Sequence, residues 1–460
     1  MSNLLFVLVG SWLLGGLFVN RQVTQQKASR WAVASAAVTT VMTAGVLVFV
    51  WQRGPLVAEL AGRVSLAADV ESLLLATLTG LVTTTVLAAG ARRELTRSVM
   101  ARLLVVAGAT LLVFFASDLV TLAAGWTAGI ALLSGSDEAS RRFAGRLLLT
   151  SALPLCAAVV WIGAVGGRLD LRGLEEGTLP AQTTTWVMLL IVVASAARMG
   201  IPPFHRAWVR LLDAGDGARA IAVVGPLTGA YALLRLGPPL SQAFVADQPW
   251  LEAWALTAAM YLAVVAFGQR KQLRLAGYLV ASQIALVFLA LCSSEEVAVH
   301  GGLTLWLALG PALTGFLLTA QAIRSRRGPV DIVRHHGLVN QAPLLAGLAF
   351  VFGMASVGLP LTLTFVAEDI IAQGLLVPHP WLAAGFVAVT ALNAINMLRH
   401  YGRVYLGATP RVRCPDLSGR ERVTLVALAA LILVAGLAPQ LALTAEADTA
   451  HHLHAAETSR

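Results

Sequence analysis

Four ionisable side chains interrupt the long apolar segments of this 460-residue sequence: Glu368, Asp369, Arg198 and Asp118. A charged group in an apolar surrounding is costly, so such residues are by default candidates for function. A carboxyl group can take up and release a proton, which makes Glu368 and Asp369 candidates for a proton path. Because neighbours on a helix point about 100° apart, we expect Glu368 to be buried and Asp369 to lie at an interface.

The other ionisable residues suggest different roles. Arginine stays protonated in proteins, so Arg198 cannot relay a proton but can supply a fixed positive charge to a nearby carboxyl. Asp118 opens an apolar segment and either joins the path or only interacts with the dipole at a helix N-terminus. His205 and His300 lie at the ends of apolar segments, where imidazole either passes protons or has a structural role.

Prolines interrupt two of the apolar segments beside these charges. Pro202 and Pro203 remove two amide donors from one segment, and Gly358 and Pro360 interrupt another. Irregular backbone inside a bilayer persists only where protein or a water-filled cavity satisfies it. Each interruption alone is compatible with an ordinary proline kink, but paired interruptions in corresponding segments indicate a transport path.

The segments that carry these residues are long and apolar enough to cross a membrane. The chain is 57% hydrophobic and only 12% charged, whereas soluble proteins have about 25% charged residues. At about 20 apolar residues for each crossing, the sequence predicts about 14 helices, near 3–19, 31–51, 72–90, 99–116, 118–135, 147–165, 184–204, 219–236, 250–268, 273–293, 301–323, 343–374, 381–398 and 423–443. The connections are too short for an independent soluble domain. The predicted fold class is therefore an all-α polytopic membrane protein.

The two interruptions lie five helices apart, in helices 7 and 12, which are therefore predicted to be discontinuous. This spacing predicts an internal repeat of five helices, and because five is odd the two repeats are inverted. The predicted organisation is helices 1–3 over 1–98, a first repeat over 99–236 and a second repeat over 250–398. Residues 399–460 hold a cytoplasmic loop, the last helix and an outside tail.

The basic residues predict the orientation in the membrane. Most of the 33 Lys and Arg residues fall on one side of the predicted helices. The other side holds Arg53, Arg63, Arg168, Arg172, Arg235 and Arg460. By the positive-inside rule, both termini face away from the cytoplasm of a bacterial cytoplasmic (inner) membrane. The net charge of +9 is then an orientation signal, so the expected partners are lipid and protons or another monovalent cation, and not nucleic acid.

Cofactor motifs are missing from the sequence. The three cysteines, Cys156, Cys292 and Cys414, form no Cys-x-x-Cys pair, so neither an iron–sulfur cluster nor a disulfide framework is predicted. The sequence also lacks a glycine-rich nucleotide-binding loop. We therefore expect no cofactor, no metal site and no catalytic residue on this chain, and its status as an enzyme stays open.

Two segments resemble motifs of the antiporter-like membrane subunits shared by respiratory complex I, multisubunit cation/proton antiporters and the DAB inorganic-carbon pumps. Residues 198–205 resemble the signature of helix 7 in that family, and residues 358–369 resemble its glycine-leucine-proline motif in helix 12. The resemblance covers nearly the whole chain and implies a proton-translocating subunit of a larger complex. It also implies that Glu368 is the key residue of the terminal channel, as in the M-type subunit of complex I.

The sequence departs from the family at four positions. Thr127 replaces a glutamate of helix 5, Arg198 replaces a lysine of helix 7, and Thr314 replaces a lysine of helix 11. The histidine of helix 8 in the family falls at an apolar position near Ile221. The resemblance therefore implies that the central proton relay of a conventional complex I subunit is largely missing, whereas Glu368 is retained. The stretches 126–128 and 141–146 look more like the DAB membrane subunit, whose partner is a soluble zinc-dependent protein similar to carbonic anhydrase.

Three functions follow from these resemblances. The leading prediction is the subunit that energises an inorganic-carbon (CO2 or bicarbonate) uptake complex, driven by a cation gradient and bound to a larger soluble or peripheral partner that carries zinc. The alternative is an M-like proton-pumping subunit of a complex I-related NADH-quinone oxidoreductase or hydrogenase, bound to other complex I-like subunits. The third is a degenerate membrane scaffold that holds a partner at the bilayer.

Overall fold

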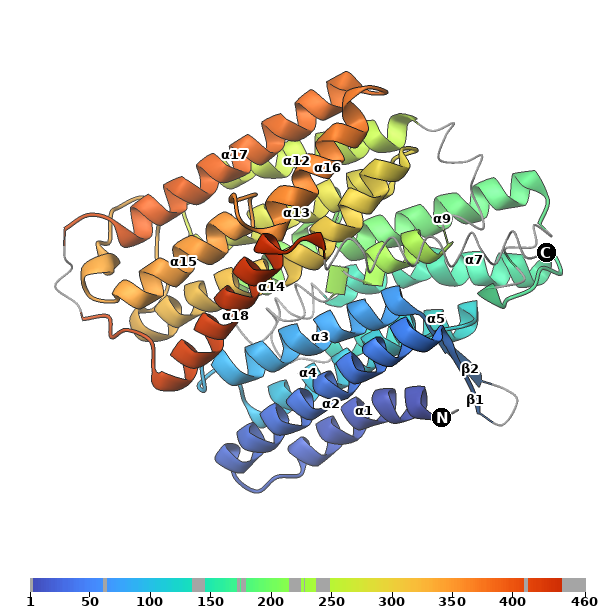
Figure 1. Ribbon diagram of the computed structural model, residues 1–460, viewed down its shortest axis with the longest axis horizontal. Helices are drawn as coiled ribbons and strands as arrows, with labels where there is room; N and C mark the ends of the chain where they lie inside the picture. Colours follow the sequence, from blue (N-terminus) through green and yellow to red (C-terminus); the bar gives the residue numbers. More distant parts are fainter. Residues whose placement is uncertain are drawn as a thin grey trace.

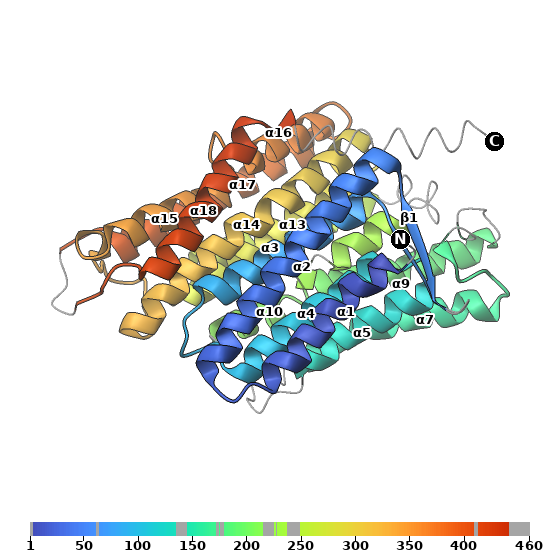
Figure 2. The ribbon, with the colours of Figure 1, turned by 60° about the horizontal axis from the view of Figure 1, so that its bottom comes forward.

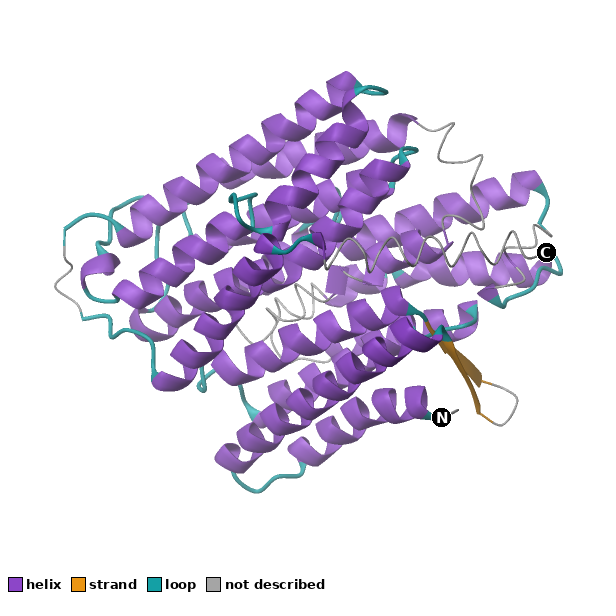
Figure 3. Ribbon diagram, viewed as in Figure 1, coloured by secondary structure: helices purple, strands orange, loops and turns teal. Residues whose placement is uncertain are grey.

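The computed structural model describes residues 3–60, 64–134, 145–171, 174, 179–214, 225–226, 228–236, 249–408 and 413–440. In this part of the chain, long helices run roughly parallel or antiparallel to one another in a single bundle (Figure 1). The only strands among these residues form one hairpin, which projects from the bundle (Figure 3).

The first elements form one side of the bundle. They are α1 (Leu4–Asn20), α2 (Gln25–Arg53), β1 (Leu56–Leu60), β2 (Val64–Ala68), α3 (Val70–Ala89), α4 (Arg97–Phe114) and α5 (Leu119–Ser134). The two strands pair antiparallel, with Leu56 opposite Ala68. Helix α3 begins directly after the hairpin, where Asp69 and Ser72 form a capping box that satisfies two amides at the helix N-terminus.

The middle elements are α7 (Ala152–Ala164), α9 (Ala181–Met199) and α10 (Arg206–Ala214), followed by the helical residues 225–226 and 228–236. Helices α7 and α9 lie at one end of the molecule, on the right in Figure 2, whereas α10 lies nearer its centre. Helices α9 and α10 are separated by the segment that contains the proline pair.

The remaining elements form the other side of the bundle. They are α12 (Pro249–Phe267), α13 (Gln272–Leu291), α14 (Glu296–Arg327), the 3-10 turn η1 (Leu338–Asn340), α15 (Pro343–Ala355), α16 (Leu363–Leu376), α17 (Pro380–Tyr405) and α18 (Gly419–Leu437). Pro343 and Pro380 are the first residues of α15 and α17, where the missing amide leaves no intrahelical bond unmade.

The helices agree with a multi-pass membrane protein. Nine helices of the described residues are long and apolar enough to cross a membrane, and α1, the apolar part of α5 and α15 are shorter apolar helices. The helical fold class is therefore confirmed, whereas the total of 14 helices and the inverted repeats stay predictions. The β1–β2 hairpin lies in residues 52–70, which the sequence predicts as a plain connection because two five-residue strands give too short a pattern to recognise.

Helix α14 lies at the core of the bundle. In its most apolar stretch 83% of the residues are buried, against 28% in α2, so α2 lies at the outside of the bundle. Glycines let other helices approach α14 closely: Gly310 faces Leu78 of α3, and Gly315 faces Phe352 of α15. Small residues at such contacts are typical of helix packing in membranes.

Candidate functional site

The first interruption lies between α9 and α10. Gly200 follows the end of α9 with φ +79°, a conformation that favours glycine, and a Cβ there would overlap the Trp208 ring. Pro202 and Pro203 lie in the non-helical residues 201–205 and are joined by a cis peptide bond. The indole N–H of Trp254 in α12 donates to the Pro202 carbonyl at 3.2 Å. The interruption is therefore packed against α12, which belongs to the side of the bundle formed by α12 to α18.

Arg198 lies in the last turn of α9, and only 2% of the residue is exposed. Its Nε donates to the Gly225 carbonyl at 3.2 Å and to Thr228 Oγ1 at 2.8 Å. The guanidinium carbon lies 5.2 Å from the centre of the Trp126 ring, a cation–π distance. Its Nη1 is buried and has no hydrogen-bond partner among the described residues.

No carboxylate of the described residues pairs with Arg198. The side chain is therefore a buried, fixed positive charge that is held by two oxygen acceptors and an aromatic face. The carboxyl that it was predicted to influence is not identified, so that role stays a prediction.

His205 lies at the other end of the same interruption, with 6% of the residue exposed. Its ring is edge-on to Tyr261 of α12, with 5.7 Å between ring centres, and 6.0 Å from the ring of Tyr278 in α13. Its Nδ1 is buried and lacks a hydrogen-bond partner in the described part of the chain. The imidazole therefore keeps one nitrogen available for a water or a proton.

The second interruption lies between α15 and α16. Residues 356–362 are not helical and include Gly358, with φ +79°, Pro360, and Leu361, with φ 74°. Leu361 is the only residue other than glycine with positive φ in the described chain, and this region is strained for a leucine. The hydroxyl of Thr362 donates to the Leu359 carbonyl at 2.6 Å, which satisfies one carbonyl that the interrupted helix leaves free.

The carboxylate of Glu368 in α16 lies against this interruption. A Cβ at Gly358 would overlap Glu368 Oε2, so the carboxylate directly contacts the glycine backbone. Its Oε1 is buried and has no hydrogen-bond partner among the residues described. The neighbouring Asp369 is exposed and accepts a hydrogen bond from Gln373 at 2.7 Å. The two adjacent carboxylates thus lie in different environments, and Glu368 is the sequestered one.

Asp118 and His300 have local partners of their own. Asp118 accepts hydrogen bonds from the amide and the hydroxyl of Thr121, both at 2.7 Å, which is the role of a residue that caps a helix. His300 lies one turn after Glu296 on α14, with 3.6 Å between its Nε2 and Glu296 Oε1, and both side chains are exposed. The structure therefore does not assign either residue to the surroundings of Glu368.

The two threonines at altered family positions bond to their own helices. The hydroxyl of Thr127 donates to the Ala123 carbonyl and that of Thr314 to the Gly310 carbonyl, both at 2.7 Å. Such bonds to the preceding turn satisfy the hydroxyl locally. Neither position supplies a titratable group.

A buried polar face of α17 was not anticipated from the sequence. Asn393 donates to Ser282 Oγ of α13 at 2.9 Å, and Asn396 donates to the Ala263 carbonyl of α12 at 2.8 Å. His400 is 1% exposed, and neither ring nitrogen has a partner in the described residues. We call Asn393, Asn396 and His400 the α17 stripe. Their spacing of three and four residues, which puts them on one helix face, is the signal that could have identified them.

Two acid–base pairs near helix N-termini were also missed. Arg235 lies 2.7 Å from Asp69, between Nη1 and Oδ2. Glu252 of α12 lies 3.9 Å from His379, between Oε2 and Nε2. Both pairs join residues far apart in the sequence, so only the tertiary structure identifies them.

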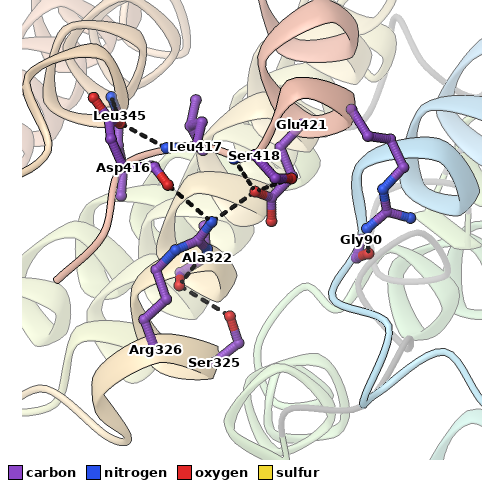
Figure 4. Close-up of polar contacts among 10 residues, drawn as sticks. Gly90, Ala322, Ser325, Arg326, Leu345, Asp416, Leu417, Ser418 and Glu421 are labelled. Carbon is purple, nitrogen blue, oxygen red and sulfur yellow. Dashed lines mark hydrogen bonds and ion pairs between the residues drawn. The ribbon is translucent and has the colours of Figure 1, made fainter.

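A polar cluster joins the helices at the far end of α14 (Figure 4). Arg326 lies 2.6 Å from Glu421 of α18, between Nη2 and Oε2, and that oxygen also accepts from Ser418. Asp416 accepts from the amides of Leu344 and Leu345 at 3.0 Å. We call Arg326, Asp416, Ser418 and Glu421 the α14–α18 cluster. It ties the end of α14 to the starts of α15 and α18.

The fold and these sites define a class of protein: a polytopic helical membrane protein with two interrupted helices, each beside a charged side chain that has a buried atom without a hydrogen-bond partner among the described residues. The family model described as "NADH:quinone oxidoreductase/Mrp antiporter, TM" matches residues 107–393, more than half of the chain. The chain belongs to this family.

The curated relatives are subunits of NADH-quinone oxidoreductases. The NADH-quinone oxidoreductase subunit M of Mycobacterium tuberculosis is 30% identical over 313 residues, which are 65% of this chain and 56% of that relative. The NADH-quinone oxidoreductase subunit 13 of Thermus thermophilus is 30% identical over 294 residues, 62% of each chain. The alignments therefore cover less than two thirds of the relatives' own length.

Solved structures share the fold over almost all of the chain. A chain of respiratory complex I from Thermus thermophilus with bound NADH has a TM-score of 0.84 and 23% identity, and 95% of this chain and 96% of that chain are covered. A chain of the Mrp complex from Dietzia sp. has a TM-score of 0.84 and 18% identity, with 96% of both chains covered.

Proposed function

We propose that this chain is a proton-translocating membrane subunit of a multisubunit complex and that Glu368 takes up and releases the proton. The observation that carries the proposal is the contact between the Glu368 carboxylate and the interrupted backbone at Gly358. Non-helical backbone at membrane depth persists only where protein or a water-filled cavity satisfies it. A carboxyl beside such backbone, with an oxygen that lacks a partner among the described residues, is placed to exchange a proton with water.

The relatives support an M-like assignment within this proposal. Those named above are subunits of NADH-quinone oxidoreductases, and chains of similar fold occur in complex I and in the Mrp complex. We therefore favour an M-like subunit with other membrane subunits as partners, in a bacterial inner membrane with both termini outside. Energy released elsewhere in the complex then drives protons through this chain.

The inorganic-carbon subunit is kept as a second candidate because of Thr127 and Thr314. Both replace charged residues of the family and bond only to their own backbone, so a conventional relay through those positions is absent. The named relatives favour the M-like subunit over this candidate. Co-purification separates the two: iron–sulfur or quinone-site subunits support the M-like assignment, and a large soluble zinc protein supports the second candidate.

Proton flux through the reconstituted chain tests the proposal. We expect Glu368→Gln to lower potential-driven proton uptake into proteoliposomes at least about tenfold, because an amide cannot carry the proton. Asp369→Asn is the matched control, since it removes the adjacent but exposed carboxylate. Unchanged flux in Glu368→Gln would overturn the proposal and favour the scaffold function.

A further inference from the structure

Glu252 and His379 form an acid–base pair, with a buried carboxyl, that the description of Glu368 leaves unused. Glu252 lies in the first turn of α12 and is 4% exposed. His379 immediately precedes α17, and its side chain is 31% exposed. The pair therefore joins a buried carboxyl to an imidazole that reaches the surface, at the end of the bundle where α16 meets α17 (Figure 1).

The partners of Glu252 differ from those of a helix-capping carboxylate. An acidic residue in the first turn often serves only the helix dipole, in which case it is solvated or accepts backbone amides. Glu252 Oε1 is instead buried without a hydrogen-bond partner in the described part of the chain, and Oε2 faces His379 at 3.9 Å. A buried polar atom without a partner is costly, so its retention points to a ligand, here a proton or a water molecule.

Further polar atoms without partners lie farther along α17, toward its C-terminal end. The amide oxygens of Asn393 and Asn396 and both ring nitrogens of His400 are buried and have no hydrogen-bond partner among the described residues. Asn393 donates a hydrogen bond to α13, and Asn396 donates one to α12. The α17 stripe therefore faces both α12 and α13. Water molecules in this stripe would satisfy these atoms.

We propose that Glu252 and His379 form the site at which protons pass between water outside the bundle and the interior of the bundle, where the α17 stripe lies. The inference rests on the proposed function, since it requires that protons cross this chain. In the step itself, the two side chains first close the 3.9 Å between Nε2 and Oε2 to hydrogen-bond distance. The Nε2–H of the protonated imidazole then gives its proton to Glu252 Oε2. This leaves neutral His379 and the carboxylic acid of Glu252, which then passes the proton to a water molecule and returns to the carboxylate.

Proton uptake by proteoliposomes that contain the full chain tests this site. We expect Glu252→Gln to lower uptake at least about tenfold, because the amide holds the geometry but accepts no proton. Glu296→Gln is the matched control, because Glu296 also faces a histidine, at 3.6 Å, but from an exposed position. Its uptake is expected to match that of the native chain.

Chemical rescue separates a proton-transfer role from a structural one. We expect His379→Gly to lower uptake and added imidazole to restore it, because His379 is reachable from the surface. The same imidazole is expected to leave Glu252→Gln at its lowered rate. A loss in His379→Gly that imidazole does not reverse would overturn the proposed transfer step.

Glu368→Gln distinguishes the failure of this inference from the failure of the proposed function. Native uptake in Glu252→Gln together with lost uptake in Glu368→Gln overturns the site at Glu252 and leaves the proposed function standing. Native uptake in both variants overturns the proposed function and, with it, this inference.

Discussion

At the residue scale, Gly358 leaves the space that the Glu368 carboxylate occupies, because glycine has no Cβ. Its φ of +79° is left-handed, which costs a residue with a Cβ about 1 kcal/mol or more, and that Cβ would overlap Glu368 Oε2. We expect Gly358→Ala to lower the unfolding temperature and to reduce proton uptake, because the carboxylate must move away from the interruption. Thermal unfolding in detergent and uptake into proteoliposomes measure the two effects.

Gly347, on helix α15 just before the interruption, supplies the control for this substitution. A Cβ there meets nothing within 4 Å, and alanine is a better helix former than glycine by about 0.5–1 kcal/mol. Gly347→Ala should therefore keep native uptake and unfold at the same or a higher temperature. Equal behaviour of the two variants would contradict the specific role of Gly358.

At the element scale, α18 covers the interruption between α15 and α16. Gly436 of α18 faces the backbone of Leu361 and Thr362 so closely that a Cβ would overlap it. Overpacking of this kind costs about 1–3 kcal/mol, so we expect Gly436→Ala to lower the unfolding temperature as α18 is pushed away. Gly419→Ala, at the start of the same helix, meets nothing within 4 Å and should change little. A native unfolding temperature for Gly436→Ala would mean that α18 does not press on the interruption.

The same elements show how far the sequence predicts the structure. The interruptions at Pro202 and Gly358 were predictable because a missing amide or a glycine acts on the local backbone. Arg198 and Glu368 were predictable as candidates because a charge stands out in an apolar segment. The pairing of Glu252 with His379 was not, because it depends on how α12 packs against α17, and no local pattern encodes that contact.

The neighbours of the charged residues could not be predicted from the sequence. Asp118 accepts hydrogen bonds from Thr121, and His300 lies 3.6 Å from Glu296, each within four residues along the chain. Their part in a proton path stays a prediction. The neutral Asn393 and Asn396 escaped notice because an amide carries no charge to mark it. Burial turns such amides into candidates, and burial is a property of the tertiary structure.

At the scale of the whole molecule, the α14–α18 cluster fastens the bundle at the end of α14 opposite to α16. Glycines place α16 beside the start of α14, where Gly301 faces Ile371 and Gly374 faces Ala298. Arg326 and the rest of the cluster lie near the last residue of α14 (Figure 4). The effects of substitutions on stability and on proton uptake should therefore differ between the two ends. The cluster holds the helices together, whereas Glu252 and His379 lie toward the other end, where α16 meets α17.

Arg326→Gln tests this separation. The ion pair with Glu421 is nearly buried, with side chains 13% and 8% exposed, and removal of one partner from such a pair costs about 2 kcal/mol or more. We expect a lower unfolding temperature but native proton uptake for each folded molecule. Arg168→Gln, which breaks an exposed pair with Asp170 at 3.9 Å, should cost less than about 1 kcal/mol. If Arg326→Gln instead abolished uptake while the protein stayed folded, the cluster would be part of the proton machinery, and the two ends of α14 would act as one unit.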